Sequence, residues 1–383
     1  ISDFDDPFAN IRRICIDFGY SKVIKCVNVF CTIFHTLVIL LEIYYTVDNF
    51  SVKLVATYGL SIAVFVYVLM LMASAIVMED EILKIFDESV SALWSTDSAG
   101  PEVQHFIKKK SAQINYMYFS IYAVVLLSST CMFPIFGDHH EWIVCEDAFD
   151  HYLGVWSKMF NQLFFWSSPV MSYVTLRFTG ALLYGIEGLS LQIFLINQRI
   201  LQISDDHPDY DKLKVGQKIL WQNKIFHTLL SCIKHHIFVV TCTCCHRIDF
   251  LHHACALTYG SPVTNKLITV FQVFENASTI MKLRLCAFST VATIIIVLYC
   301  QAGQKISDQM EGIFDTLTQC SWHNWDAKNK QILLIFMENS LKPFSLGFAG
   351  YTADYKLAAS IMRTSFSYGV VVYNLGILSD RSN

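Results

Sequence analysis

The sequence predicts an all-α, polytopic membrane protein with seven transmembrane helices, a cytoplasmic N-terminus and an extracellular C-terminus. Its composition is the first indication, because 54% of the 383 residues are hydrophobic and only 16% are charged. Soluble domains carry about a quarter charged residues. The length of the apolar runs is the second indication, since a helix needs about 20 mostly apolar residues to cross a bilayer.

The clearest predicted span is the run from Leu54 to Met78, which contains no charged residue. A fifth span is predicted within residues 237–274, although His246, Arg247 and Asp249 make this segment too polar to face lipid throughout. We therefore expect a long helix whose first part projects into water. The remaining predicted spans cover residues 27–47, 113–137, 159–196, 285–302 and 355–378.

The orientation follows from the distribution of Lys and Arg. These residues gather before the first span, between the second and third, and between the fourth and fifth, which places those segments in the cytoplasm. Lys282 and Arg284 oppose the rule. The glycosylation sequons at Asn49 and Asn276 both lie outside in this orientation. The chain starts at Ile1 without a visible cleavable signal peptide, so we expect an internal segment to direct insertion and N-terminal residues to be missing.

Several function classes are disfavoured by what the sequence lacks. The formal net charge is only −4, and no basic stripe with interleaved aromatic residues indicates nucleic-acid binding. The chain contains no phosphate-binding glycine loop, nucleophile elbow or convincing catalytic carboxylate pair. We therefore expect no enzymatic activity, no cofactor and no nucleic-acid partner.

The cysteines do not form the framework of a secreted disulfide-rich protein, because most of the 13 lie in apolar runs. Cys131 and Cys145 flank a predicted outside loop and could pair, although the sequence alone does not decide this. Cys242, Cys245 and neighbouring His and Asp residues share one face of the predicted fifth helix. A row along a helix spans too far for one tetrahedral ion, so no metal site is expected.

The end of the chain carries an unusual polar stripe. Ser367, Val371 and Asn374 follow one another at spacings of four and three, so they share a helical face. Small polar residues on a membrane helix commonly serve helix packing. They also suit the lining of a water-filled path, in which Val371 and Leu375 would form an apolar constriction.

Residues 299–375 resemble the C-terminal third of insect odorant receptors, whereas the preceding part of the chain resembles them in topology only. Two positions depart from the family pattern, because Thr318 and Ala358 stand where aromatic residues are usual. The matching features are a Cys and Gly turn after the sixth span (Cys300, Gly303), a following Trp (Trp322), a Lys-Pro pair (Lys342-Pro343), and the terminal motif of Ser367-Tyr368 with Asn374-Leu375.

The resemblance implies an odorant-binding subunit of a ligand-gated, non-selective cation channel. Such a subunit assembles with a co-receptor into a heterotetramer in the plasma membrane of an olfactory neuron dendrite, where it contacts lipid and permeant cations. The implied regions are the ligand-binding helices at 1–302, a cytoplasmic anchor at 303–341 and a terminal pore helix with its tail at 342–383. The resemblance assigns Ser367, Val371, Asn374 and Leu375 to the pore and gate, and Trp322 and Trp325 suit the subunit interface of the anchor.

A small volatile ligand calls for an enclosed apolar and aromatic pocket. The resemblance places this pocket between the outer halves of the second, third and fourth spans and the sixth. The candidate residues there are Tyr58, Ile62, Phe65, Ser129, Met132, Phe133, Phe136, Trp166, Met171 and Tyr173.

Two other receptor classes are alternatives. The related gustatory receptors share the terminal Tyr motif, but the Trp322 to Lys342-Pro343 block favours the odorant receptors. A G-protein-coupled receptor is contradicted because Asp-Arg-Tyr is absent after the third span and Asn-Pro-x-x-Tyr is absent from the last. The co-receptor itself is disfavoured because residues 201–234 are much shorter than its loop between the fourth and fifth spans.

Overall fold

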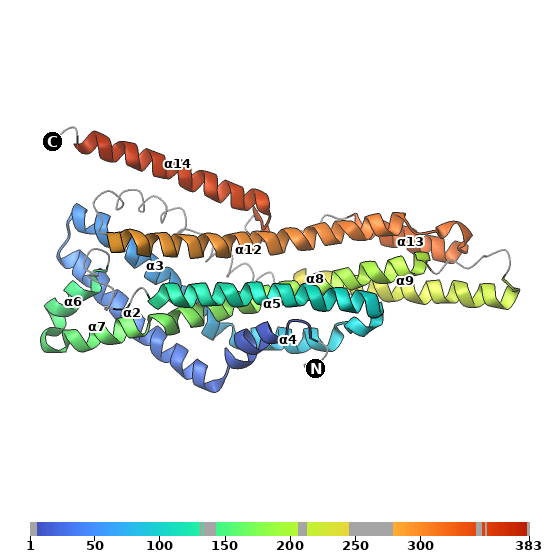
Figure 1. Cartoon of the computed structure of the whole chain (residues 1–383), viewed down its shortest axis with the longest axis horizontal. Helices are drawn as coiled ribbons and strands as arrows, with labels where there is room; N and C mark the ends of the chain where they lie inside the picture. Colours follow the sequence, from blue (N-terminus) through green and yellow to red (C-terminus); the bar gives the residue numbers. More distant parts are fainter. Residues whose placement is uncertain are drawn as a thin grey trace.

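The protein is an elongated bundle of long helices in a computed structural model (Figure 1) that describes residues 6–130, 133, 143–205, 213–244, 279–341, 347–348 and 351–380. The predicted all-α class is confirmed, with one short β-hairpin as the exception. The helices of the first half are α1 (Ala9–Arg12), the π-helix η1 (Arg13–Phe18), α2 (Lys22–Asp48), α3 (Val52–Val77), α4 (Glu79–Ala92), the 3₁₀-helix η2 (Thr96–Ala99) and α5 (Pro101–Thr130). The later elements are α6 (Cys145–Leu153), the 3₁₀-helix η4 (Gly154–Trp156), α7 (Ser157–Trp166), α8 (Ser168–Asp205), α9 (Val215–Cys244), α12 (Thr279–Thr318), the 3₁₀-helix η6 (Trp322–Asn324), α13 (Ala327–Ser340), β1 (Gly347–Phe348), β2 (Tyr351–Thr352) and α14 (Tyr355–Asp380).

Helix α8 is the centre of the bundle. It packs against α12, α9, α3 and α5, and most of its side chains are shielded by these neighbours. Its apolar residues recur on every side of the helix, as expected for a helix that is surrounded by others. The largest hydrophobic core, which includes Ile193, Ile196 and Ile200, follows this helix toward α9, α12 and α13.

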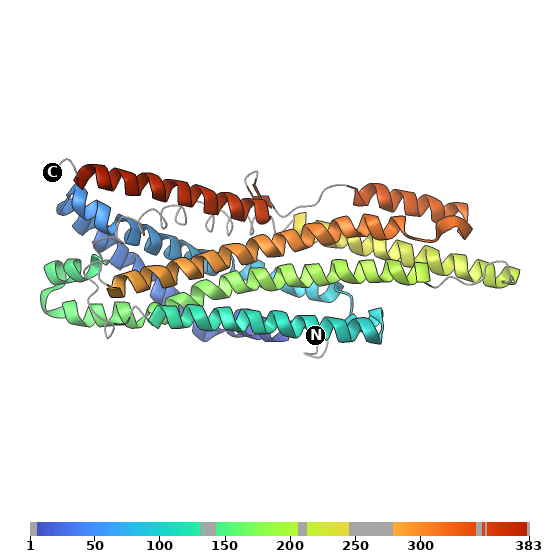
Figure 2. The ribbon, with the colours of Figure 1, turned by 45° about the horizontal axis from the view of Figure 1, so that its top comes forward.

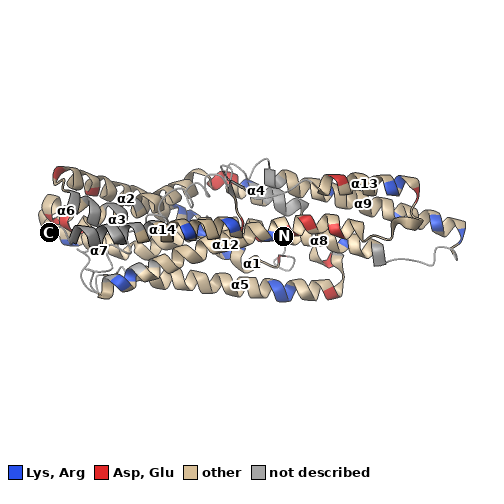
Figure 3. Ribbon diagram, turned by 90° about the horizontal axis from the view of Figure 1, so that it is seen from above, with Lys and Arg blue, Asp and Glu red and all other residues tan. Residues whose placement is uncertain are grey.

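The described helices include apolar segments long enough to cross a membrane. By length and composition these are Lys22–Asp48, the run Cys145–Ile203 and Lys282–Thr318, and α3 adds the shorter apolar segment Val64–Val77. Charged residues are sparse over the half of the bundle that holds α2 and α7, and frequent over the half that holds α9 and α13 (Figure 3). This asymmetry fits one half in lipid and the other half in water.

The sixth predicted span does not end in a turn. Cys300 and Gly303 were expected to form one, but α12 continues as a helix from Thr279 to Thr318. Gly303 has no role in bending the chain here, because its missing side chain makes room for the backbone of Ala353. The boundary that we predicted between residues 302 and 303 therefore lies inside a continuous helix.

The segment between the fourth and fifth predicted spans is mostly helical rather than a loop. Helix α8 continues to Asp205 and α9 begins at Val215, so helices cover most of residues 201–234. The apolar pattern of α9 is hidden in the sequence because Lys224, His227 and Lys234 are exposed on one side of the helix, whereas the polar His235 is buried on the other. The rest of the predicted fifth span, from residue 245, lies outside the described residues.

The predicted outside loop after the third span also contains helix. Helix α6 occupies Cys145–Leu153, and its amphipathic pattern buries Ala148 and Phe149. The helix ends at Gly154, whose positive φ of 51° is a conformation that glycine adopts readily. Cys145 is a buried free thiol, and Cys131 lies outside the described residues.

The chain enters its last helix through the hairpin of β1 and β2, which pairs Gly347 with Thr352 and Phe348 with Tyr351. Asp354 then caps α14, because its carboxylate accepts hydrogen bonds from the Leu357 amide at 2.8 Å and from the Thr352 hydroxyl at 2.8 Å. Burial alone would raise the pKa of Asp354, but these hydrogen bonds outweigh it and the pKa is lowered. Beyond its first turns α14 runs along the edge of the bundle (Figure 2).

Candidate functional site

An aromatic cluster joins two of the helices that we expected to hold the ligand, α3 and α7, to α2 and α6, which we did not. It consists of Phe34 on α2, Phe65 on α3, Phe149 on α6, and Phe160, Phe164 and Phe165 on α7. The rings of Phe65 and Phe164 lie 5.5 Å apart between their centroids. Phe65 also contacts a second apolar cluster that contains Met72 and Met171. Phe65 and Met171, two of the predicted ligand residues, are thus brought together.

Other predicted ligand residues lie where α5 ends. The hydroxyl of Ser168 donates a hydrogen bond to the carbonyl oxygen of Ser129 at 3.2 Å. The rings of Phe133 and Trp166 lie 4.4 Å apart, which links the end of α5 to α7. Ser129 is almost fully buried, at 2% exposed, so it packs at the junction of α5 with α8.

Of the remaining predicted ligand residues, Tyr173 packs against the cluster that contains Met72 and Met171, and the others lie elsewhere on α3 or outside the description. Tyr173 donates its hydroxyl hydrogen bond to the carbonyl oxygen of Ile14 at 2.9 Å, so its polar end points to the N-terminal segment. Tyr58 and Ile62 are half-buried on α3. Met132 and Phe136 lie outside the described residues. The assignment of all these residues to a ligand pocket stays a prediction.

Sequence reasoning missed the polar pair beside the aromatic cluster. His35 on α2 lies 2.9 Å from the hydroxyl of Ser167, measured from its Nε2 atom, and the imidazole packs edge-on against Phe164. His35 was visible only as an interruption of an apolar run, and its partner is 132 residues away in the chain. An apolar site with one well-placed polar pair has the composition of a small-molecule site.

Among the side chains that the structure describes, those near the start of the terminal helix attach it to the bundle. Leu357, Ala358 and Ile361 pack against Ile296 and Cys300 of α12. Farther along, Met362, Phe366 and Val370 are exposed by 44%, 63% and 42%, and Ser367 is exposed as well. Val371, Asn374 and Leu375 lie in the helix, but their side chains are outside the description.

The two tryptophans predicted at the subunit interface have different surroundings. Trp325 is 4% exposed and belongs to the main core, where α9, α12 and α13 meet. Trp322 is 41% exposed and stacks on His323. Within one subunit Trp325 is therefore already covered, whereas Trp322 presents its indole at the surface. Their role in subunit contacts stays a prediction.

The predicted glycosylation site Asn49 directly follows the end of α2 and is exposed, so its side chain is accessible to modifying enzymes. The second site, Asn276, lies outside the described residues. Among the described residues no cluster of His, Cys, Asp and Glu has the arrangement of a metal site. Cys245 and the His and Asp residues that follow it, which we did not expect to bind metal, lie outside the description.

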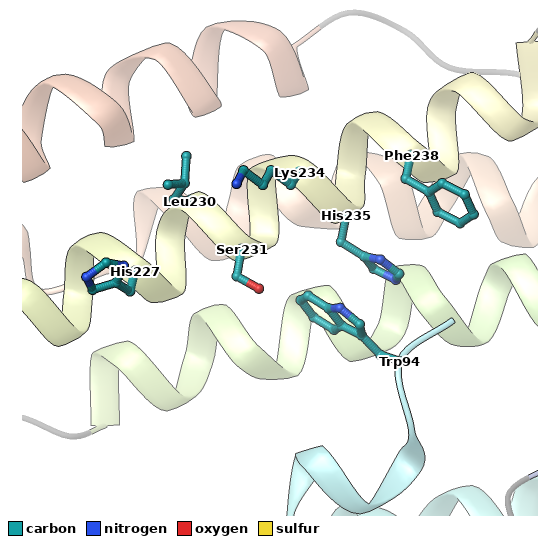
Figure 4. Close-up of a pocket in the computed structure, with 7 residues that line it drawn as sticks. All are labelled: Trp94, His227, Leu230, Ser231, Lys234, His235 and Phe238. Atoms are coloured by element: carbon teal, nitrogen blue, oxygen red, sulfur yellow. The ribbon is translucent and has the colours of Figure 1, made fainter. Parts of the chain in front are cut away.

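A cavity of about 450 Å³ opens on α9, on the side that faces the linker after α4 (Figure 4). At its edge the rings of Trp94 and His235 stack with centroids 4.2 Å apart. Gln192 of α8 holds both residues, because its Oε1 atom accepts from the Trp94 amide at 2.9 Å and lies 2.9 Å from His235 Nε2. The three residues tie α8, α9 and the linker together.

Burial at this junction lowers the pKa of His235 to about 4, so the imidazole is neutral in the folded protein. An unfolded His has a pKa near 6.5, and acid therefore favours the unfolded chain. We expect His235 to reduce stability by about 2 kcal/mol between about pH 7 and pH 5, within the window from about 6.5 down to 4. Thermal unfolding of purified receptor at several pH values measures this loss.

The control for this prediction is His235→Phe, which keeps an aromatic ring against Trp94 but cannot titrate. This variant should show a flatter dependence of the unfolding temperature on pH, although His236, whose pKa burial also lowers, retains part of it. Equal pH dependence in both proteins would contradict the assignment.

The bundle of apolar helices and the aromatic cluster define the class of polytopic, all-helical membrane proteins. Residues 53–366 match the protein family described as 7tm Odorant receptor. The match covers most of the chain, so the protein belongs to this family. Membership in this family confirms the resemblance to insect odorant receptors and the seven-span fold class that were predicted from the sequence. It favours a receptor over an enzyme. It also sets aside the gustatory and G-protein-coupled alternatives.

Individual relatives agree with the family assignment. Odorant receptor 22c from Drosophila melanogaster is 23% identical over 100 residues, which cover 26% of this chain and 25% of the relative. The chain thus aligns with about a quarter of that relative's length. The solved structure of the insect olfactory receptor OR5 from Machilis hrabei has a TM-score of 0.69 at 9% identity and covers 91% of this chain and 88% of that chain. The structure of OR5 in complex with eugenol has a TM-score of 0.59 at 12% identity and covers 98% of this chain and 100% of that chain.

Proposed function

We propose that this odorant receptor is a subunit of a ligand-gated, non-selective cation channel in the plasma membrane of olfactory neurons. Its N-terminus is cytoplasmic, and it assembles with a co-receptor into a heterotetramer. A small volatile odorant binds near the aromatic cluster, and the terminal helix of each subunit lines the pore. The volatile class is supported by the complex of the related OR5 with eugenol.

The exposure of α14 carries the proposal. Large apolar side chains such as Phe366 and Val370 are exposed in one subunit. They lie on α14, the helix that the sequence predicts to be the last membrane span. A helix with exposed small polar residues beside exposed apolar ones can contact neighbouring subunits on one side and face water on the other. In such an arrangement Ser367 and Asn374 face the pore, and Val371 and Leu375 form its gate.

The test of this function is the double variant Val371→Ala with Leu375→Ala, recorded under voltage clamp in cells that also express the co-receptor. Smaller side chains widen an apolar constriction and weaken its exclusion of water. We expect an increased resting cation current and activation at lower odorant concentration. The matched control is Met362→Ala, an exposed position nearer the start of the helix. Unchanged leak and unchanged activation in the double variant would argue against a gate at these residues.

The ligand site is tested at the aromatic cluster. We expect Phe65→Leu and Phe164→Leu to change the half-maximal concentration of aromatic odorants by up to about tenfold, because an aromatic pair contributes about 1 kcal/mol beyond its area. Dose–response currents over an odorant panel measure this change, with surface expression recorded for each variant. Phe119→Leu is the control, since Phe119 is 41% exposed on α5. Response profiles identical to the unmodified receptor in both cluster variants would place the ligand elsewhere.

A further inference from the structure

Arg177 is a fully buried cation near the middle of the helix bundle. It lies on α8 with 0% of its surface exposed. Its Nη1 atom donates a hydrogen bond to the carbonyl oxygen of Gly19, and its guanidinium carbon lies 4.6 Å from the centre of the Tyr20 ring. The Nε and Nη2 atoms have no hydrogen-bond partner among the described residues.

Three further buried polar atoms, on residues that contact Arg177, interact with it electrostatically or follow its partner Gly19 in the chain, are likewise without hydrogen-bond partners in the described part of the chain. They are the hydroxyl oxygens of Tyr20 and Ser21, which directly follow Gly19, and the Oε2 atom of Glu79. Arg177, Tyr20 and Glu79 lie within electrostatic reach of one another. The unpartnered atoms therefore gather where the start of α2 meets α8 and the junction of α3 with α4.

Hydrogen-bond donors dominate this polar cluster. Nε and Nη2 of Arg177 carry N–H groups that can only donate, and the hydroxyls of Tyr20 and Ser21 can donate as well. The one unpartnered oxygen that can only accept, while ionised, is Oε2 of Glu79. A water molecule brings as many donors as acceptors, so water alone leaves the excess of donors in place. A ligand that only accepts hydrogen bonds would satisfy these excess donors.

The balance of charges around Arg177 also favours a ligand that accepts hydrogen bonds and is negatively charged. Glu79 is already engaged by Lys25, whose Nζ atom lies 3.1 Å from its Oε1 atom. Two cations therefore share one carboxylate, and Arg177 is the cation that is removed from solvent. A buried charge without full compensation is costly, and ionisable groups within membrane segments usually mark functional sites.

We propose that Arg177, Tyr20 and Ser21 form a binding site for one small monovalent anion of the size of chloride. The anion accepts hydrogen bonds from the guanidinium and the two hydroxyls and balances the charge of Arg177. A small ion is required because all of these donor atoms are buried. The site ties the N-terminal segment to α8, because Arg177 contacts Gly19 and Tyr20.

The test is the thermal unfolding of purified receptor complex in chloride and in gluconate at equal ionic strength. Gluconate is the comparison because it is too large for an enclosed site. We expect the unfolding temperature to rise with chloride and then to saturate. Arg177→Met should abolish this rise, whereas the control Arg363→Gln should retain it, because Arg363 is exposed on α14. Equal unfolding temperatures of the unmodified complex in the two salts would show that water alone fills the site and would overturn the proposal.

A second variant keeps the test decisive if Arg177→Met does not fold. Tyr20→Phe retains the ring under the guanidinium but removes one hydroxyl donor. A hydrogen bond to a charged group contributes enough free energy that its loss should raise the half-saturating chloride concentration about tenfold. An unchanged half-saturating concentration in Tyr20→Phe would overturn the proposed ligand set.

Discussion

Replacing Gly303 by alanine is expected to destabilise the receptor and to disrupt the attachment of the terminal helix. A Cβ atom at this position would collide with the carbonyl oxygen of Ala353 and lie 2.9 Å from its Cβ atom. Alanine favours a helix over glycine by about 1 kcal/mol, whereas overpacking against a neighbour costs about 1–3 kcal/mol. Because the nearest atom belongs to the backbone, the collision should dominate, with a net loss of about 2 kcal/mol.

The measurements are the unfolding temperature of purified receptor and the odorant-evoked current per receptor at the cell surface. Both should fall in Gly303→Ala, since the packing of Ile296 and Cys300 against Ala358 depends on the same close approach of α12 and α14. Gly312→Ala is the matched control on α12, because its Cβ atom would meet only Asn197 at 3.9 Å. That variant should gain up to about 1 kcal/mol. If the two alanine variants behaved alike, the close approach at Gly303 would carry no energetic weight.

Gly303 also illustrates what could be predicted from the sequence and what could not. The resemblance singled out Gly303 but assigned it to a turn, because the sixth span of the family ends in a turn that contains Cys and Gly. The structure instead uses the missing side chain for contact with Ala353, a residue 50 positions later. A requirement for close backbone approach is created by tertiary packing, and local periodicity does not report it.

The same distinction applies to the spans and the site. The uncharged run of α3 and the apolar α2 could be predicted from the sequence, because the bilayer sets the length and composition of each spanning helix separately. The 3.6-residue pattern of α9 was obscured by its Lys and His residues, so its start was misplaced. Phe65 could be selected as a candidate because aromatic residues are conspicuous in a span, and its role in ligand binding stays a prediction. The pairing of His35 with Ser167 required the relative register of α2 and α7, which no single segment contains.

The ion pair between Glu187 and Lys305 gives the second large expected effect. Glu187 is 6% exposed on α8, and its Oε2 atom lies 2.5 Å from Nζ of Lys305 on α12. Removal of one partner of a buried pair leaves an uncompensated charge and costs about 3–5 kcal/mol. Lys305 is 30% exposed, so the variant that leaves a buried charge without its partner is Lys305→Met. We therefore expect Lys305→Met to lower the free energy of unfolding by about 3 kcal/mol, measured by thermal or chemical unfolding of the purified receptor.

Two further variants distinguish the cost of leaving a charge buried from the cost of losing a contact. In the double variant Glu187→Leu with Lys305→Met, no charge remains buried, and most of the lost stability should return because apolar replacement of a whole buried pair is often neutral. Asp17→Asn is the matched surface control, since Asp17 is 53% exposed beside Arg12, and it should change stability by less than about 1 kcal/mol. The neighbouring hydrogen bond from Ser190 to Gln309, at 2.7 Å, keeps α8 and α12 in register in every variant. A double variant as unstable as Lys305→Met alone would mean that the pair stabilises through its specific geometry and not by charge compensation.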